Sequence, residues 1–308
     1  MKGLDLAEAY YYEYGAPMLE GQFSDNMNRL AVGFVGPGSE CFGFDDEISR
    51  DHDWGPGFCI WLTDEDALKI GQRIQEEYER LPKIYRGFGP RIVSPGEETR
   101  TGACATTDFY RRYTGLNHPP ATNKEWLAIP EQSLALCTNG RVFFDPLGDF
   151  SKRRDSLLGY YPEDVRLKKM ASRCMTASQA GQYNFERSLK RNERFAALYA
   201  ETQFCMDVFL LIFLFNKQYA PFYKWMHRAV RGLPVLGEKI YGMISMLINL
   251  ADMDEKKSAI EGICALIIEE LHNQGLSDSD SDFLLDHAHH IHGKIKDREL
   301  GGRFWVVS

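Results

Sequence analysis

Two short apolar runs joined by a glycine-rich and acidic segment constrain the fold of this chain more than any other feature. The runs are 30–36 and 57–62; Gly36-Pro37 ends the first, and Gly55-Pro56-Gly57 begins the second. Apolar runs of this length between such breaks are typical of buried β-strands. The N-terminal part of the chain is therefore expected to build a sheet, with the connecting segment at its edge.

The first run ends in the turn sequence Gly36-Pro37-Gly38-Ser39. Glycine lets backbone N–H groups turn inward without obstruction by side chains, which makes a nest for an anion such as a phosphate. The hydroxyl group of Ser39 adds one more donor. We therefore predict that Gly38 and Ser39 contact the phosphates of a ligand.

Two carboxylates, Asp51 and Asp53, stand just before the second run, at the predicted leading edge of its strand. In an extended strand, residues two apart project from the same face about 7 Å from each other. Magnesium prefers oxygen ligands and uses one or two carboxylates together with substrate phosphates. This pattern predicts a metal site, and the alternative interpretation is an exposed acidic loop.

The rest of the chain divides into a first part with mixed structure and a second part that is helical. Helical patterns at 4–19 and 67–81 flank the strand signals, residues 86–125 predict an irregular insertion, and Asn139-Gly140 predicts a hairpin or a helix-to-strand turn. After residue 160 strand signals end. The predicted class is α+β, with a mixed-sheet domain at 1–150 and an α-helical bundle at 151–308. The expected helices of the second part are 163–178, 180–215, 217–230, 236–250, 254–274 and 279–297.

Composition limits the kind of protein and the kind of partner. The chain has 308 residues, 44% of them hydrophobic, which is enough for real cores, and its net charge of -8 creates no global field that attracts nucleic acid. The seven cysteines include no C-x-x-C pair and no secretory signal precedes them, which indicates reduced thiols in the cytoplasm. The most apolar stretch, 204–215, is only twelve residues long and contains Asp207, so we expect a buried helix rather than a membrane span.

The glycine turn and the acidic pair together resemble the nucleotidyltransferase superfamily, which has the fold of DNA polymerase beta. Its signature is an apolar strand ending in Gly-Gly or Gly-Ser, a short gap and then Asp-x-Asp or Asp-x-Glu; here eleven residues separate Ser39 from Asp51. The chain is most similar overall to a bacterial subfamily described as a domain of unknown function, near the kanamycin and lincosamide nucleotidyltransferases. The other similar stretches are 138–146, 181–184 and 216–225.

The resemblance implies a third carboxylate from a later strand that completes the metal site and helps to deprotonate the acceptor. Asp145, which follows Val142-Phe143-Phe144, is the candidate. Asp145 could instead begin a turn with Pro146, or Asp149 or Glu131 could fill the position.

Related enzymes also hold the triphosphate with lysine and tyrosine from the helical domain. The corresponding candidates are Lys217, Tyr219 and Lys224. Lysine offers a compact cation to phosphate oxygens, and tyrosine adds a donor on an apolar ring. The alternative is that the tyrosine packs between helices and the lysines are merely solvated.

The reaction that the resemblance implies is transfer of a nucleoside monophosphate from a nucleoside triphosphate to a hydroxyl or phosphate acceptor, with release of pyrophosphate. Mg²⁺ or Mn²⁺ would be bound by Asp51, Asp53 and Asp145. The acidic net charge favours a small-molecule acceptor over a nucleic acid. Two alternatives stay open: a protein of the same fold that binds a nucleotide or a protein without chemistry, and a haloacid-dehalogenase-like phosphatase with Asp51 as nucleophile.

Overall fold

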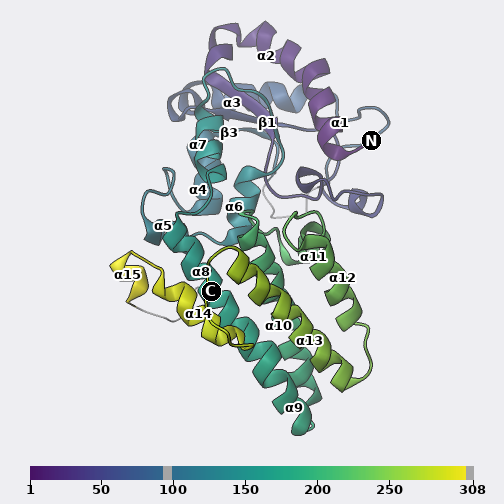
Figure 1. Ribbon diagram of the computed structural model, residues 1–308. Helices are drawn as coiled ribbons and strands as arrows, with labels where there is room; N and C mark the ends of the chain where they lie inside the picture. The colour runs from purple at the N-terminus through teal and green to yellow at the C-terminus, as the bar shows by residue number, and fades with distance from the viewer. Residues whose placement is uncertain (93–98, 303–308) are drawn as a thin grey trace. The chain divides into compact units, whose positions relative to one another are not determined.

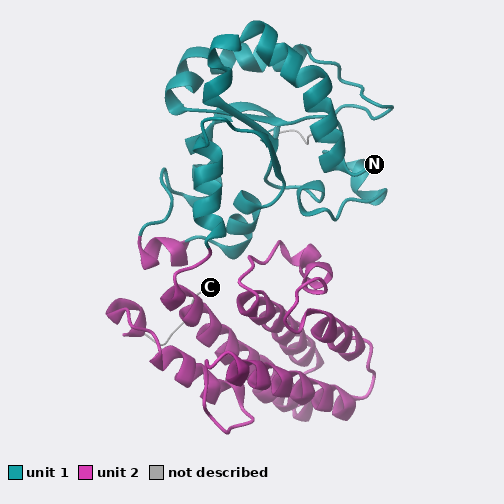
Figure 2. Ribbon diagram, turned by 45° about the horizontal axis from the view of Figure 1, so that its top comes forward, with its two compact units in different colours: residues 1–121, 129–159 teal, residues 122–128, 160–308 magenta. Residues whose placement is uncertain are grey.

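The computed structural model describes residues 1–92 and 99–302 and divides into two compact units. Unit 1 contains residues 1–121 and 129–159, and unit 2 contains residues 122–128 and 160–308 (Figure 2). Unit 1 carries a mixed four-stranded sheet with helices, and the described part of unit 2 is helical. This confirms the predicted α+β class. The division falls at Gly159/Tyr160 instead of at residue 150. In addition, the short segment 122–128 belongs to unit 2, although the residues on both sides of it belong to unit 1.

The sheet of unit 1 has the order β3-β2-β1-β4, with β1 at Leu30–Phe34, β2 at Cys59–Leu62, β3 at Gly102–Ala105 and β4 at Arg141–Phe144. Strand β1 runs antiparallel to both of its neighbours, while β2 and β3 are parallel. The end of β1 and the starts of β2 and β3 therefore lie at one edge of the sheet. The segments that leave β1 and enter β2 and β3 meet at this edge.

Alternating side chains give the sheet two buried faces. Leu30 and Val32 of β1 and Ile60 of β2 belong to a core shared with α1 (Gly3–Tyr10), α2 (Ala16–Gln22) and α3 (Asp64–Arg80). On the other face the Trp61 ring stacks on Phe150, with ring centroids 3.7 Å apart. The helices of unit 1 that remain are α4 (Thr106–Thr114), α6 (Glu131–Thr138) and α7 (Asp149–Leu158) (Figure 1).

Unit 2 is built around two long helices, α8 (Glu163–Ala177) and α10 (Arg194–Phe215), which pack against each other. By length and composition α10 could cross a membrane, but 67% of its most apolar window is buried within the structure, as in the core helix of a soluble protein. This confirms the expected buried helix at 204–215. A π-helical segment, Ser178–Phe185, follows α8. The other α-helices described in unit 2 are α5 (Asn123–Ala128), α9 (Glu186–Lys190), α11 (Tyr223–Val230), α12 (Gly237–Leu247), α13 (Met253–Asn273), α14 (Leu284–Gly293) and α15 (Arg298–Gly301).

Three of the predicted elements differ from the structure. The predicted helix at 180–215 is interrupted, because Asn192 has a left-handed backbone with φ of 59°, and α10 begins only at Arg194. The predicted insertion at 86–125, of which 93–98 lie outside the described residues, contains β3, α4 and α5. The predicted helix at 217–230 begins only at Tyr223, because Lys217 has a left-handed backbone with φ of 51° and Pro221 cannot donate a helical hydrogen bond. The turn at Asn139-Gly140 joins α6 to β4, which is one of the two predicted outcomes.

Candidate functional site

The glycine turn after β1 is held by the side chain of Asn139. The Gly36 N–H donates to Asn139 Oδ1 at 2.9 Å, and Asn139 Nδ2 donates to the Gly36 carbonyl at 2.8 Å. Gly140 must be glycine, because its φ is 62° and a Cβ there would lie 2.0 Å from the Phe34 carbonyl oxygen. The turn has the positive φ angles that glycine permits, 122° at Gly36 and 118° at Gly38. One N–H of the predicted phosphate nest is thus already used by a side chain.

The acidic pair does not lie on a strand, so that prediction is wrong. Asp51 is the exposed last residue of a 3₁₀ turn, Ile48–Asp51, and Asp53 has a left-handed backbone with φ of 43°. Strand β2 begins only at Cys59, because Gly55 and Gly57 both take positive φ angles and interrupt the extended chain. The two-residue alternation of a strand therefore does not apply to Asp51 and Asp53.

Asp53 instead joins Glu40, Arg91 and Arg100 in a buried group that we call the arginine–carboxylate cluster. Arg91 Nη1 donates to Glu40 Oε1 at 2.9 Å, and Arg100 Nη2 donates to the same oxygen at 3.2 Å. Arg100 Nε donates to Asp53 Oδ2, and Arg100 Nη1 donates to the Pro37 carbonyl. Arg100 thus links the glycine turn to Asp53, so the two motifs from the sequence do meet at this edge of the sheet.

The side chains of the cluster are largely buried, from 2% exposed at Glu40 to 14% at Arg100. The Glu40 side chain is 2% exposed and the Arg91 side chain 7%. Burial alone would lower the pKa of the Arg100 guanidinium, but Glu40 and Asp53 outweigh it and raise that pKa. Three buried atoms of the cluster have no hydrogen-bond partner among the described residues: Asp53 Oδ1, Arg91 Nε and Arg91 Nη2. Buried polar atoms are rarely left without a partner, so the cluster has unused bonding capacity.

Asp145 lies away from the cluster, contrary to its predicted role as the third carboxylate. Strand β4 is antiparallel to β1, and Phe144 pairs with Val32, so Asp145 is beside the first half of β1, whereas the glycine turn follows the end of β1. Its two carboxylate oxygens accept from the N–H groups of Gly148 and Ser151, each at 2.8 Å. Asp145 therefore organises the turn into α7, which corresponds to the alternative interpretation.

These carboxylates do not form a resident metal site in this arrangement. Asp53 is paired with two guanidinium groups, and Asp145 is occupied by backbone donors. No group of three or more His, Cys, Asp or Glu side chains that could hold a metal ion occurs among residues 1–92 and 99–302. The predicted set of Asp51, Asp53 and Asp145 is thus not brought together.

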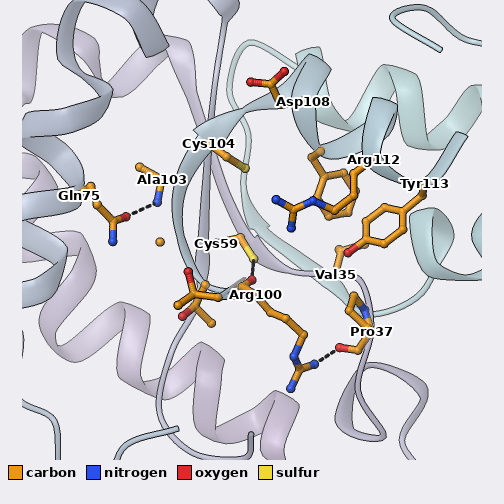
Figure 3. A pocket seen from close by; sticks show the side chains of 14 residues that line it. Val35, Pro37, Cys59, Gln75, Arg100, Ala103, Cys104, Asp108, Arg112 and Tyr113 are labelled. Atoms are coloured by element: carbon orange, nitrogen blue, oxygen red, sulfur yellow. Dashed lines mark hydrogen bonds between the residues drawn. The ribbon is translucent and has the colours of Figure 1, made fainter. Parts of the chain in front are cut away.

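Two cavities of unit 1 adjoin the segment Thr99–Thr101. The first, the α4 cavity, has a volume of about 320 Å³ and is lined among others by Pro37, Cys59, Cys104, Arg112 and Tyr113 (Figure 3). The second, the Asp53 cavity, has a volume of about 280 Å³, and its lining includes Asp53, Arg91, Tyr10, Tyr78 and Lys83. Both are also lined by Gln75 and by all three residues of Thr99–Thr101.

The lysines and the tyrosine predicted to bind the nucleotide lie in unit 2. Lys217 and Lys224 are exposed, and Lys224 Nζ lies over the Trp225 ring at 4.7 Å from its centroid. The Tyr219 ring packs against Tyr160 and Tyr161, with centroids 4.9 and 5.1 Å apart. These contacts are those of the alternative interpretation, in which the tyrosine packs in the helical unit.

Comparison with known proteins finds one family model, described as a domain of unknown function (DUF4037), that matches residues 126–226. No curated protein matches the chain significantly. The matched residues contain the stretches 138–146, 181–184 and 216–225, and with them Asn139 and Asp145. The glycine turn, Asp51 and Asp53 precede the matched region.

Sequence reasoning missed Glu40, Arg91, Arg100 and Asn139. Glu40 directly follows the Gly38-Ser39 pair, so its position was a usable signal. Asn139 was noted only as a turn residue, and its bond to Gly36 spans 103 residues of sequence. The two arginines come from a segment without periodicity, where the sequence gives no sign of which side chain turns inward.

Proposed function

We propose that this protein is a nucleotidyltransferase that acts in the cytoplasm and transfers a nucleoside monophosphate from a nucleoside triphosphate to a small-molecule acceptor. The observation that carries the proposal is that Arg100 binds both Asp53 and the Pro37 carbonyl. Arg100 thus connects the two sequence motifs that resemble those of the superfamily, and it lines both cavities. Strongly coupled buried charges beside cavities are typical of functional sites.

In this proposal an acceptor oxygen attacks the α-phosphorus, the bond from that phosphorus to the bridging oxygen breaks, and pyrophosphate leaves. The acceptor proton passes to a carboxylate, for which Asp53 is the candidate because it lines a cavity. The arginines of the cluster offset the negative charge of the phosphates. Mg²⁺ or Mn²⁺ arrives as the counter-ion of the triphosphate and is part of that substrate.

The proposal is tested by calorimetric binding of ATP, GTP, CTP and UTP with and without Mg²⁺, followed by pyrophosphate release with a panel of sugars and amino alcohols. We expect Asp53→Asn to lower the turnover by about 100-fold or more, the usual effect of removing one charged catalytic group. Glu47→Gln, an exposed acid in the same loop, is the matched control and should turn over normally. No nucleotide binding by the wild type, or equal turnover in Asp53→Asn, would overturn the proposal.

A second candidate function is nucleotide binding without chemistry. It is favoured by the pairing of Asp53 with two arginines, which leaves no acidic cluster for a metal among the described residues. Nucleotide binding that needs Arg100 but is followed by no pyrophosphate release with any acceptor would support it. The same two measurements thus separate the two functions.

A further inference from the structure

We infer that the α4 cavity is the binding site for a phosphate chain, with Arg112 as its cation. This inference rests on the proposed function only for the identity of the phosphate chain, which would be the pyrophosphate end of the nucleotide. Gly38 and Ser39, the residues that the sequence predicted to hold phosphates, do not line this cavity. The inference therefore assigns phosphate binding to different residues, on α4 and on the segment that enters β3.

The direction of the side chains supports an anionic ligand. Figure 3 shows the Arg112 guanidinium and the Tyr113 ring reaching from α4 toward Cys59 and Val35, while the Asp108 carboxylate points away from the cavity centre. Asp108, the acid in the lining, accepts from Arg111 Nη2 at 2.6 Å, and this bond offsets its charge. A guanidinium at a cavity wall can bind phosphate oxygens through two parallel N–H groups.

The two thiols and the Tyr113 hydroxyl of the cavity are neutral at physiological pH. Burial raises the pKa of the Cys59 and Cys104 thiols to about 12, although the Arg112 charge opposes the shift in both. Burial also raises the pKa of Tyr113 to about 12, against a hydrogen bond from Arg112. None of these groups adds negative charge near neutral pH, so nothing in them repels a phosphate.

Size and position fit the phosphate end of a nucleotide. A volume of about 320 Å³ is at the lower end of the range for small-molecule sites, which begins near 300 Å³, and suits a phosphate chain better than a whole nucleotide. Arg100 lines both this cavity and the one that contains Asp53. A chain bound beside Arg112 would therefore lie next to Arg100, the residue that also binds Asp53.

The test is calorimetric titration of inorganic pyrophosphate, without metal, into the wild type, Arg112→Gln, Arg112→Lys and Arg111→Gln. Arg111 is the matched control, since it is the preceding residue on α4, carries the same charge and does not line the cavity. We expect Arg112→Gln to weaken binding by at least 10-fold, Arg112→Lys to weaken it less, and Arg111→Gln to change it by less than 2-fold. Both arginines are exposed, so the variants should fold, and their melting temperatures would verify this.

Three results would overturn the inference: no pyrophosphate binding by the wild type, equal binding by Arg112→Gln, or equal weakening by Arg111→Gln. Its failure is distinguishable from failure of the proposed function. Nucleotide turnover that does not need Arg112 would refute this site and leave the function standing. Pyrophosphate binding that needs Arg112 in a protein without nucleotide turnover would leave the site standing and refute the function.

Discussion

Buried charges are arranged in opposite ways in the two units. In unit 2, Lys256 Nζ donates to both carboxylate oxygens of Glu201, at 2.6 and 2.7 Å, and the side chains are 6% and 7% exposed. In unit 1, two arginines share Glu40 and Asp53, and three buried atoms of that cluster lack hydrogen bonds among the described residues.

This difference separates a structural ion pair from a site with capacity for a ligand. In the pair of unit 2, one lysine binds both oxygens of one carboxylate and joins α10 to α13. The cluster in unit 1 adjoins two cavities and joins loops that leave or enter strands. Loops on a rigid scaffold are where binding groups are concentrated.

The largest expected effect on stability is at the pair in unit 2. Lys256→Ala leaves Glu201 buried without its cation, which should lower the free energy of unfolding by about 3–5 kcal/mol. Lys257→Ala is the matched control, since the next lysine makes an exposed pair with Glu186 and its loss should change stability little. Urea unfolding of both variants measures the difference. Equal effects of the two substitutions would remove the contrast drawn between the units.

A smaller effect is expected for Arg91→Met in the cluster of unit 1. Arg100 still binds both Glu40 and Asp53 in this variant, and two unsatisfied N–H groups of Arg91 disappear. The free energy of unfolding should therefore fall by about 1.5–3 kcal/mol, the value of a hydrogen bond to a charged group, and by less than in Lys256→Ala. Urea unfolding is again the measurement. A loss as large as that of Lys256→Ala would show that the cluster is structural.

The smallest effect is expected for Asp145→Ala, which sharpens the choice among the acids of unit 1. Loss of its two hydrogen bonds at the start of α7 should lower the free energy of unfolding by about 1 kcal/mol, as for a helix cap. Any nucleotide turnover should stay near the wild-type value. Asp145→Asn keeps an acceptor and should cost less. Turnover abolished in both variants with unchanged urea midpoints would restore Asp145 to the catalytic set.

Local patterns predicted most of the elements because each depends on neighbouring residues. Periodicity placed α3, α8, α13 and the first two strands close to their observed bounds, whereas α10 begins fourteen residues after the start of the predicted helix at 180–215. The pattern failed at 86–125, because β3 has only four residues and obtains its hydrogen bonds from β2, far from it in sequence. No local signal specifies such a strand.

The candidate site was only partly accessible to sequence reasoning. The meeting of the glycine turn with Asp53 followed from the antiparallel pairing of β1 and β2, which short connected strands favour. The spatial position of Asp145 depended on the direction of β4 in the sheet, which the sequence does not state. The conformation at Asp53, with φ of 43°, was equally hidden, since a left-handed backbone is uncommon at residues other than glycine.

Helix α5 is synthesised well before the rest of the unit in which it packs. It is encoded within the first half of the chain, yet it belongs to unit 2, where Trp126 is 5% exposed and its ring centroid is 5.7 Å from that of Tyr161. A growing chain displays this tryptophan before its partner on the later segment exists. Cutting the chain at Gly159/Tyr160 would leave α5 on the fragment that contains unit 1, although α5 packs in unit 2. The segment after residue 159 is therefore not a self-contained module, because unit 2 also includes residues 122–128, which lie on the first fragment.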